Sequence, residues 1–180
     1  MTDQELEQLK YPIGKTVCPK HITENQVKEW IEVLEYFPKR LEQLVKDLTE
    51  EQLDTPYRPG GWTVRQVIHH VSDSHLHSYC RFKWAMTETN PTIKAYDELA
   101  WSELHDYSAP IETSLLHLKV VHSKLVYFIK GLSEQDLERT FIHPDGNKTI
   151  ALKENLGMYA WHSLHHYAHI ERLMAREGWY

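Results

Sequence analysis

The chain has 180 residues, of which 41% are apolar and 26% are charged, and its net charge is −6 with the histidines neutral. This length and composition predict one folded domain over residues 1–180 and exclude an intrinsically disordered chain. The negative charge, with lysines and arginines scattered among acidic residues, excludes a general nucleic-acid binder, which would present a basic stripe.

Two cysteines, Cys18 and Cys80, lie far apart in the chain and lack the spacing of a metal or redox motif. So few cysteines exclude a disulfide framework and favour a reducing compartment. The first residues are acidic and lack the apolar run of a secretory signal, and nowhere do about 18 apolar residues follow one another. We therefore expect a cytoplasmic protein without a membrane span, in which residues 1–22 form an N-terminal extension.

The first long helix is predicted over residues 24–48, where apolar residues recur at steps of three and four. Thr23 and Gln26 have the spacing of a capping box at its start. Thr49 and Gln52 repeat this spacing and predict a short additional helix directly afterwards.

The next segment, residues 55–62, is predicted to be a loop because it is rich in proline and glycine. A second long helix follows over residues 63–88, and a short helix is expected over residues 97–104. Pro110 is suited to the first turn of a third long helix, which we expect to end at Gly131.

Ser133 and Asp136 bracket another short helix, and residues 143–147 form a turn between two small apolar segments that predict a minor hairpin. The fourth long helix is expected over residues 152–177, with Gly178 as its end. Four long helices with connections of moderate length predict an all-α four-helix bundle, with short extra helices in the connections.

The thirteen histidines are clumped, with four of them in residues 69–77 and four in residues 162–169. In the fourth helix two pairs, His162/His166 and His165/His169, have the four-residue spacing that places both rings on one face. Either pair could chelate a metal ion. On a helical wheel His165 lies nearly opposite the apolar side, which favours His162 and His166, because metal sites in bundles face other helices.

A third ligand is expected from the second helix, where His70 lies somewhat closer to the apolar stripe than His69. Asp73 and His77 fall on the same side as His70 and are candidates to orient a ligand. No cysteine is near, and three neutral nitrogens leave coordination positions open, which is typical of catalytic sites. The plain alternative is that the histidines are structural or face solvent.

The sequence also resembles a known family, the YfiT-like branch of the DinB superfamily, which contains metal-dependent hydrolases and bacillithiol S-transferases. The similarity extends from about Tyr11 to Trp179. The resemblance is carried by four stretches, which are Leu53-Asp-Thr-Pro-Tyr-Arg58, Gly60-Gly-Trp-Thr-Val-Arg-Gln66 with His69-His70, Ala100-Trp-Ser-Glu-Leu104, and Trp161-His-Ser-Leu-His-His166.

This resemblance implies a four-helix bundle, a homodimer, and one divalent metal ion per subunit held by His70, His162 and His166. We expect zinc, with nickel or another transition metal as alternatives. The implied activity is that of a metal-dependent hydrolase acting on a small-molecule substrate. A bacillithiol-type thiol S-transferase needs the same ligands and is the alternative, and a non-catalytic metal-binding bundle is the alternative of another class.

The sequence identifies no catalytic acid or base and no substrate. Trp62, Trp161 and Tyr159 are candidates for the walls of a pocket, although aromatic residues at helical spacing are more often core. Arg58 and Arg65 are candidates to receive an anionic group of a substrate.

Overall fold

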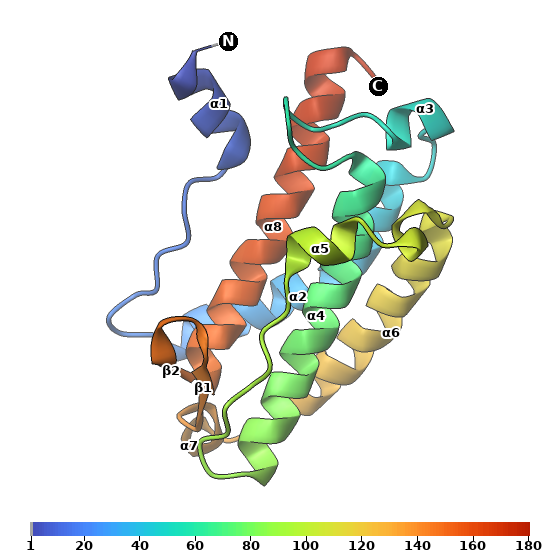
Figure 1. The fold of residues 1–180 in the computed structure, drawn as a ribbon. Helices are drawn as coiled ribbons and strands as arrows, with labels where there is room; N and C mark the ends of the chain where they lie inside the picture. Colours follow the sequence, from blue (N-terminus) through green and yellow to red (C-terminus); the bar gives the residue numbers. More distant parts are fainter. Residues whose placement is uncertain (1) are drawn as a thin grey trace.

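Four long helices make up most of the chain in the computed structural model, which describes residues 2–180 (Figure 1). They are α2 (Glu24–Val45), α4 (Val64–Thr87), α6 (Ile111–Lys130) and α8 (Leu152–Glu177). The predicted four-helix bundle is confirmed. Within residues 2–180, no helix combines the length and the apolar character needed to cross a membrane.

Short elements fill the connections and the N-terminal segment. They are α1 (Asp3–Lys10), α3 (Glu50–Leu53), α5 (Glu98–Ser102), a 3₁₀ turn at His105–Ser108, α7 (Glu134–Leu137), the antiparallel strands β1 (Thr140–His143) and β2 (Lys148–Ala151), and a 3₁₀ turn between them at Asp145–Asn147. The short helices expected after residues 48, 96 and 132 and the minor hairpin are thus all present.

Local capping explains why these bounds follow the sequence closely. The side chains of Thr23, Thr49 and Thr63 each accept a hydrogen bond from the backbone N–H three residues further on. In each case the residue at that position is a glutamine, whose side chain accepts a hydrogen bond from the backbone N–H of the threonine. α8 ends at Gly178, which has a positive φ of 69°. The first long helix ends at Val45 rather than near Leu48.

Helix α1 was not predicted within the extension of residues 1–22. A capping box of Thr2 with Glu5 starts it, but it contains no buried residue. Its apolar face consists of Leu6 and Leu9 alone, which are half-buried, so the pattern is too short to stand out in the sequence. Figure 1 shows α1 beside α8, outside the four long helices.

The order of the helices around the bundle places the two histidine clusters together. α4 packs against α6 and α8, and α2 packs against the same two helices, so α2 and α4 are diagonal to each other. The histidines of α4 therefore face those of α8 directly. Two apolar clusters within the bundle hold the four helices in this arrangement, and their fully buried side chains include Leu41, Val67, Ile68, Leu118, Leu34, Phe82, Leu125, Phe141 and Leu156.

Candidate metal centre

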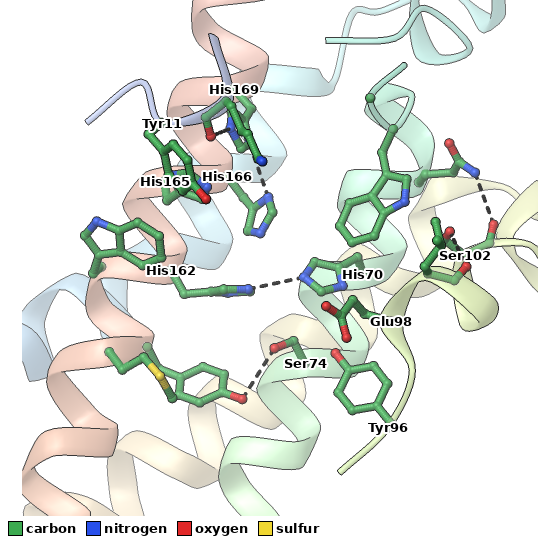
Figure 2. Close-up of a pocket in the computed structure, with 18 of the residues that line it drawn as sticks. Tyr11, His70, Ser74, Tyr96, Glu98, Ser102, His162, His165, His166 and His169 are labelled. Atoms are coloured by element: carbon green, nitrogen blue, oxygen red, sulfur yellow. Dashed lines mark hydrogen bonds between the residues drawn. The ribbon is translucent and has the colours of Figure 1, made fainter. Parts of the chain in front are cut away.

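Three histidines from two helices converge on one point. His70 lies on α4, and His162 and His166 lie one turn apart on α8. Each of the three offers a ring nitrogen that lies within 4.8 Å of the other two. Figure 2 shows the rings directed toward a common space between α4 and α8. Three imidazole nitrogens gathered this closely form a group that could hold one metal ion.

The protonation of these rings suits a metal ion. Burial, and to a lesser extent the neighbouring His165, lowers the pKa of His70 to about 4. Burial also lowers the pKa values of His162 and His166 well below the ordinary value for histidine. All three rings are therefore neutral at pH 7 and present lone pairs, which metal binding requires.

The two nitrogens of His70 have unusual surroundings. Nε2 of His70 lies 3.2 Å from Nε2 of His162, and two nitrogen lone pairs at this distance must share either a proton or a cation. Nδ1 of His70 is buried and has no hydrogen-bond partner within residues 2–180. These features fit a divalent transition-metal ion bound by the three rings.

A chain of hydrogen bonds determines which nitrogen of His162 is free. Nδ1 of His122 lies 2.5 Å from the carbonyl oxygen of Leu34, which can only accept, so this nitrogen carries the proton. Nε2 of His122 then accepts from Nδ1 of His75 at 2.9 Å, and Nε2 of His75 accepts from Nδ1 of His162 at 3.1 Å. With neutral rings, the lone pair of His162 is left on Nε2, which faces His70. We call Leu34, His122, His75 and His162 the inner chain.

A second chain does the same for His166. Nε2 of His169 donates to the carbonyl oxygen of Lys10 at 3.1 Å, which leaves the lone pair of His169 on Nδ1. That nitrogen lies 3.4 Å from Nδ1 of His166, which is its donor. Nε2 of His166 is therefore free to bind a metal ion. We call Lys10, His169 and His166 the outer chain.

A cavity of about 900 Å³ opens beside the three histidines. This volume suits a small molecule. The ring of Trp62 lies 4.5 Å from that of His70, and Trp161 stacks on His165 at 4.3 Å. The expectation that Trp62, Trp161 and Tyr159 line a pocket is confirmed, since all three are part of its wall.

The other histidines of the two clusters have structural contacts. Nδ1 of His69 bonds Ser114 at 2.7 Å and its Nε2 bonds the carbonyl oxygen of Ala109 at 3.1 Å, so neither nitrogen is free. His165 is buried although it was predicted on the side of the helix opposite the apolar stripe. Its burial involves the N-terminal segment, since the ring of Tyr11, directly after α1, lies 6.0 Å from the ring of His165.

Asp73 and His77, the residues predicted to orient a metal ligand, contact other residues instead. The carboxylate of Asp73 accepts from the hydroxyl of Tyr107 at 2.8 Å, and His77 stacks on Tyr96 at 4.3 Å. Neither lines the cavity. The orienting contact comes from His75 instead, together with His122. The sequence held a clue to the role of His122, which is a single histidine within the apolar stripe of α6. A buried imidazole needs hydrogen-bond partners for both of its nitrogens.

The two arginines considered for substrate binding differ in their availability. Arg65 donates to Asp54 at 2.7 Å and to Glu50 at 2.5 Å, so it is a structural ion pair. Arg58 lines the cavity. A third arginine, Arg81, also lines it and was not singled out from the sequence.

Fold and site together define a helical bundle with a candidate three-histidine metal centre. The chain belongs to the DinB superfamily, whose family model matches residues 33–170. A relative from Bacillus cereus strain AH820, named "Putative metal-dependent hydrolase", is 49% identical over 174 residues, covering 97% of this chain and 100% of the relative. A relative of the same name from Oceanobacillus iheyensis is 50% identical over 170 residues, covering 94% and 98%.

Solved structures show the same architecture. YfiT from Bacillus subtilis, described as "a probable metal-dependent hydrolase with an unusual four-helix bundle topology", matches with a TM-score of 0.94 and 48% identity, over 96% of this chain and 99% of YfiT. The four-helix bundle protein TT2238 matches with a TM-score of 0.55 and 21% identity, over 83% and 98%, and this match supports the fold alone.

Proposed function

We propose that the chain is a metal-dependent hydrolase whose ion is held by His70, His162 and His166. The observation that carries this proposal is the convergence of three neutral imidazoles at the wall of a cavity. When bound, a divalent ion supplies Lewis-acid chemistry, which activates water near neutral pH and polarises an acyl group. The names of the relatives and of YfiT support the same activity.

The protein's own residues prepare this chemistry. The inner and outer chains hold the protons of His162 and His166 on the nitrogens that face away from the shared point. Trp62 covers one side of His70 and limits the access of water to it. The cavity that Trp62 helps to line also reaches His162 and His166, so a substrate bound in it lies beside all three histidines.

A thiol S-transferase of the bacillithiol type is the second candidate. It is favoured because the cavity offers no buried carboxylate as a general acid or base. The acidic residues that line it among residues 2–180 are Glu98, Glu103 and Asp145, and all three are exposed. Hydrolysis of an amide benefits from a positioned general acid or base, whereas a thiol ionised by a metal ion does not need one.

One assay series separates these functions. Protein purified without an affinity tag is loaded with metal and tested against a panel of esters and amides, and separately against a thiol with an electrophile. We expect turnover of an ester or amide that stops when a chelator removes the ion and returns when the ion is restored. Turnover only in the thiol arm favours the transferase, and absence of turnover in both arms favours a non-catalytic bundle.

We propose zinc as the ion, with nickel as the alternative, since imidazole ligands accept both. Elemental analysis of the untagged protein tests this. We also propose a homodimer, supported by an exposed apolar stripe on α6, where Leu116, Val120 and Tyr127 are 64%, 50% and 85% exposed. Light scattering measures the oligomeric state. The proposed cytoplasmic location agrees with the free thiols of Cys18 and Cys80.

A further inference from the structure

Arg81 is a buried cation within the wall of the metal cavity. It lies on α4, eleven residues after His70, which is close to three full turns and places both residues on one face of the helix. Their backbones are about 16 Å apart along the axis. Side chains of helices lean toward the N-terminus, so the long side chain of Arg81 extends from its own turn toward His70.

The guanidinium of Arg81 has few partners for a group that is only 5% exposed. Nη1 donates to the hydroxyl of Tyr159 at 3.3 Å, which is its one hydrogen bond within residues 2–180. Nε is buried and has no partner. No carboxylate of the described residues lies within ion-pair distance, as the ion pairs of residues 2–180 do not include Arg81.

Arg65, also on α4, is a buried arginine with a structural role and serves as a comparison for Arg81. It is 6% exposed, nearly the same as Arg81, yet it is neutralised by Asp54 and Glu50. Buried charges in proteins are normally paired, because removal from water is costly without a counter-charge. Two equally buried arginines on α4 therefore differ in that one lacks a counter-charge.

The groups around Arg81 add no negative charge. His143 of β1 and His77 of α4 both feel its positive charge, which, after burial, lowers the pKa of each ring. Asp145 also lines the cavity, but its carboxylate is exposed and lies 3.7 Å from Nδ1 of His143. The ring of Phe141 lies 5.9 Å from the guanidinium and offers only a weak cation–π contact.

The cavity connects this cation with the three histidines. The hydroxyl of Tyr159 lies between Arg81 and Ser74, with Ser74 at 3.4 Å, and the ring of Tyr159 lies 5.6 Å from that of His162. Figure 2 shows Ser74 near His70 and His162, with its hydrogen bond drawn as a dashed line. One tyrosine therefore separates the unpaired cation from the metal ligands.

We propose that Arg81 receives an anionic group of the substrate, while the reacting group of the same molecule lies at the three histidines. The substrate class is a small molecule with a carboxylate or phosphate at one end, since a guanidinium pairs with either. This inference deepens the proposed function and rests on it for the reacting end. A neutral polar group would satisfy a free N–H, but only an anion neutralises the charge.

The test measures binding without turnover. Zinc-loaded full-length protein is titrated with succinate, with inorganic phosphate, and with succinamide as the neutral analogue of succinate, at constant ionic strength. We expect at least one anion to raise the melting temperature and to bind by calorimetry, and succinamide to do neither. The anion that binds more tightly identifies the group as a carboxylate or a phosphate. Failure of both anions to bind, or equal binding of succinamide, would overturn the inference.

Matched variants assign the binding to this arginine. R81M is expected to lower the affinity for the anion by about tenfold or more. R81K should lower this affinity less, because lysine keeps the positive charge. R40M removes an exposed arginine of α2 that lies over Tyr167, and it should leave affinity unchanged. Anion affinity that is the same in R81M and in the unmodified chain contradicts the proposal.

The stability of the variant gives an independent reading. Without ligand, R81M should melt at or above the temperature of the unmodified chain, because an uncompensated charge has been removed from the interior. A clearly lower melting temperature would mean that Arg81 is already paired within the fold, and would overturn the inference. If anions bind through Arg81 but no ester or amide is hydrolysed, the proposed function fails alone. Hydrolysis without binding of anions refutes this inference alone.

Discussion

The inner and outer chains orient two neighbouring histidines by the same logic but from different parts of the molecule. The inner chain starts at the carbonyl oxygen of Leu34 in α2, crosses α6 and α4, and reaches His162 entirely within the bundle. The outer chain starts at Lys10, the last residue of α1, and has one histidine between this carbonyl and His166. Both end in a free Nε2 at the shared point.

This difference indicates that the candidate metal centre would depend on two kinds of structural support. The inner chain moves only if packed long helices move, because α2, α4, α6 and α8 all contribute to it or surround it. The anchor of the outer chain belongs to a helix with no buried residue. Such a segment opens at a lower free energy than the core. Four variants or conditions test this comparison.

Removal of a ligand should have the largest effect. H162A and H166A each remove one of three donors, and metal affinity should fall by more than the about 10–100-fold that is typical for loss of an outer partner. H21A removes an exposed histidine and serves as the control. Competition with a chelator measures affinity, and elemental analysis measures content. If H165A or H169A abolished binding while H162A did not, the ligand assignment would be wrong.

Acidification of the metal-free protein should have the next largest effect. Burial lowers the pKa of His122 in the inner chain to about 4 and of His169 in the outer chain to about 3. Between about pH 6.5 and these values the unfolded chain binds more protons than the folded one, so stability falls as pH falls. For His122 the loss approaches about 3 kcal/mol at most.

Urea unfolding at pH 7.5, 6 and 5 in the presence of a chelator measures this loss. H122F should show a smaller decline with pH than the unmodified chain, since the titrating group is gone. H21A should decline like the unmodified chain. A free energy of unfolding that stays constant from pH 7.5 to 5 would contradict the neutral state of these rings.

The parts of the molecule that followed from the sequence are those set by neighbours in the chain. Capping by Thr23, Thr49 and Thr63 involves residues three positions apart, so the helix starts were predictable. The proximity of His162 and His166 follows from one helical turn. The pairing of these two with His70 followed from the family resemblance, because periodicity alone separated His70 from His69 by little.

The remaining features depend on which helices meet. His122 reaches His75 because α6 packs on α4, a contact between residues 47 positions apart that no local pattern reveals. The carbonyl oxygen of Lys10 reaches His169 across 159 positions. Arg81 has no carboxylate beside it, and only the packed structure shows that a neighbour is missing. Such facts require the three-dimensional arrangement.

Interruption of the inner chain should have an intermediate effect. H122F removes the donor to Leu34 and the acceptor for His75, so the tautomer of His75 and therefore of His162 is no longer fixed. We expect metal affinity to fall by about 100-fold, at the upper end of the range for outer partners. The matched control is H117F, since His117 lies on the same helix and bonds Ser72 away from the three ligands.

The readouts distinguish orientation from general loosening. Nitrogen-15 chemical shifts of the histidine rings report which nitrogen of His162 carries the proton, and H122F should change them whereas H117F should not. A melting temperature lowered equally in both variants, with metal affinity unchanged in H122F, would show that the inner chain serves stability alone.

Removal of the outer anchor should have the smallest effect. Deletion of residues 1–10 takes away the carbonyl oxygen of Lys10, so His169 loses the partner that keeps its proton on Nε2. We expect metal affinity to fall by about tenfold, at the lower end of the range for outer partners, because water can replace the lost carbonyl at this edge of the bundle. K10A keeps the backbone carbonyl and should retain affinity, which separates the anchor from the charge of the side chain. Equal losses of metal affinity in K10A and in the deletion would assign the effect to the lysine side chain. If the deletion lowered metal affinity as much as H122F does, the distinction between a ligand held by the core and one held by the N-terminal segment would be wrong.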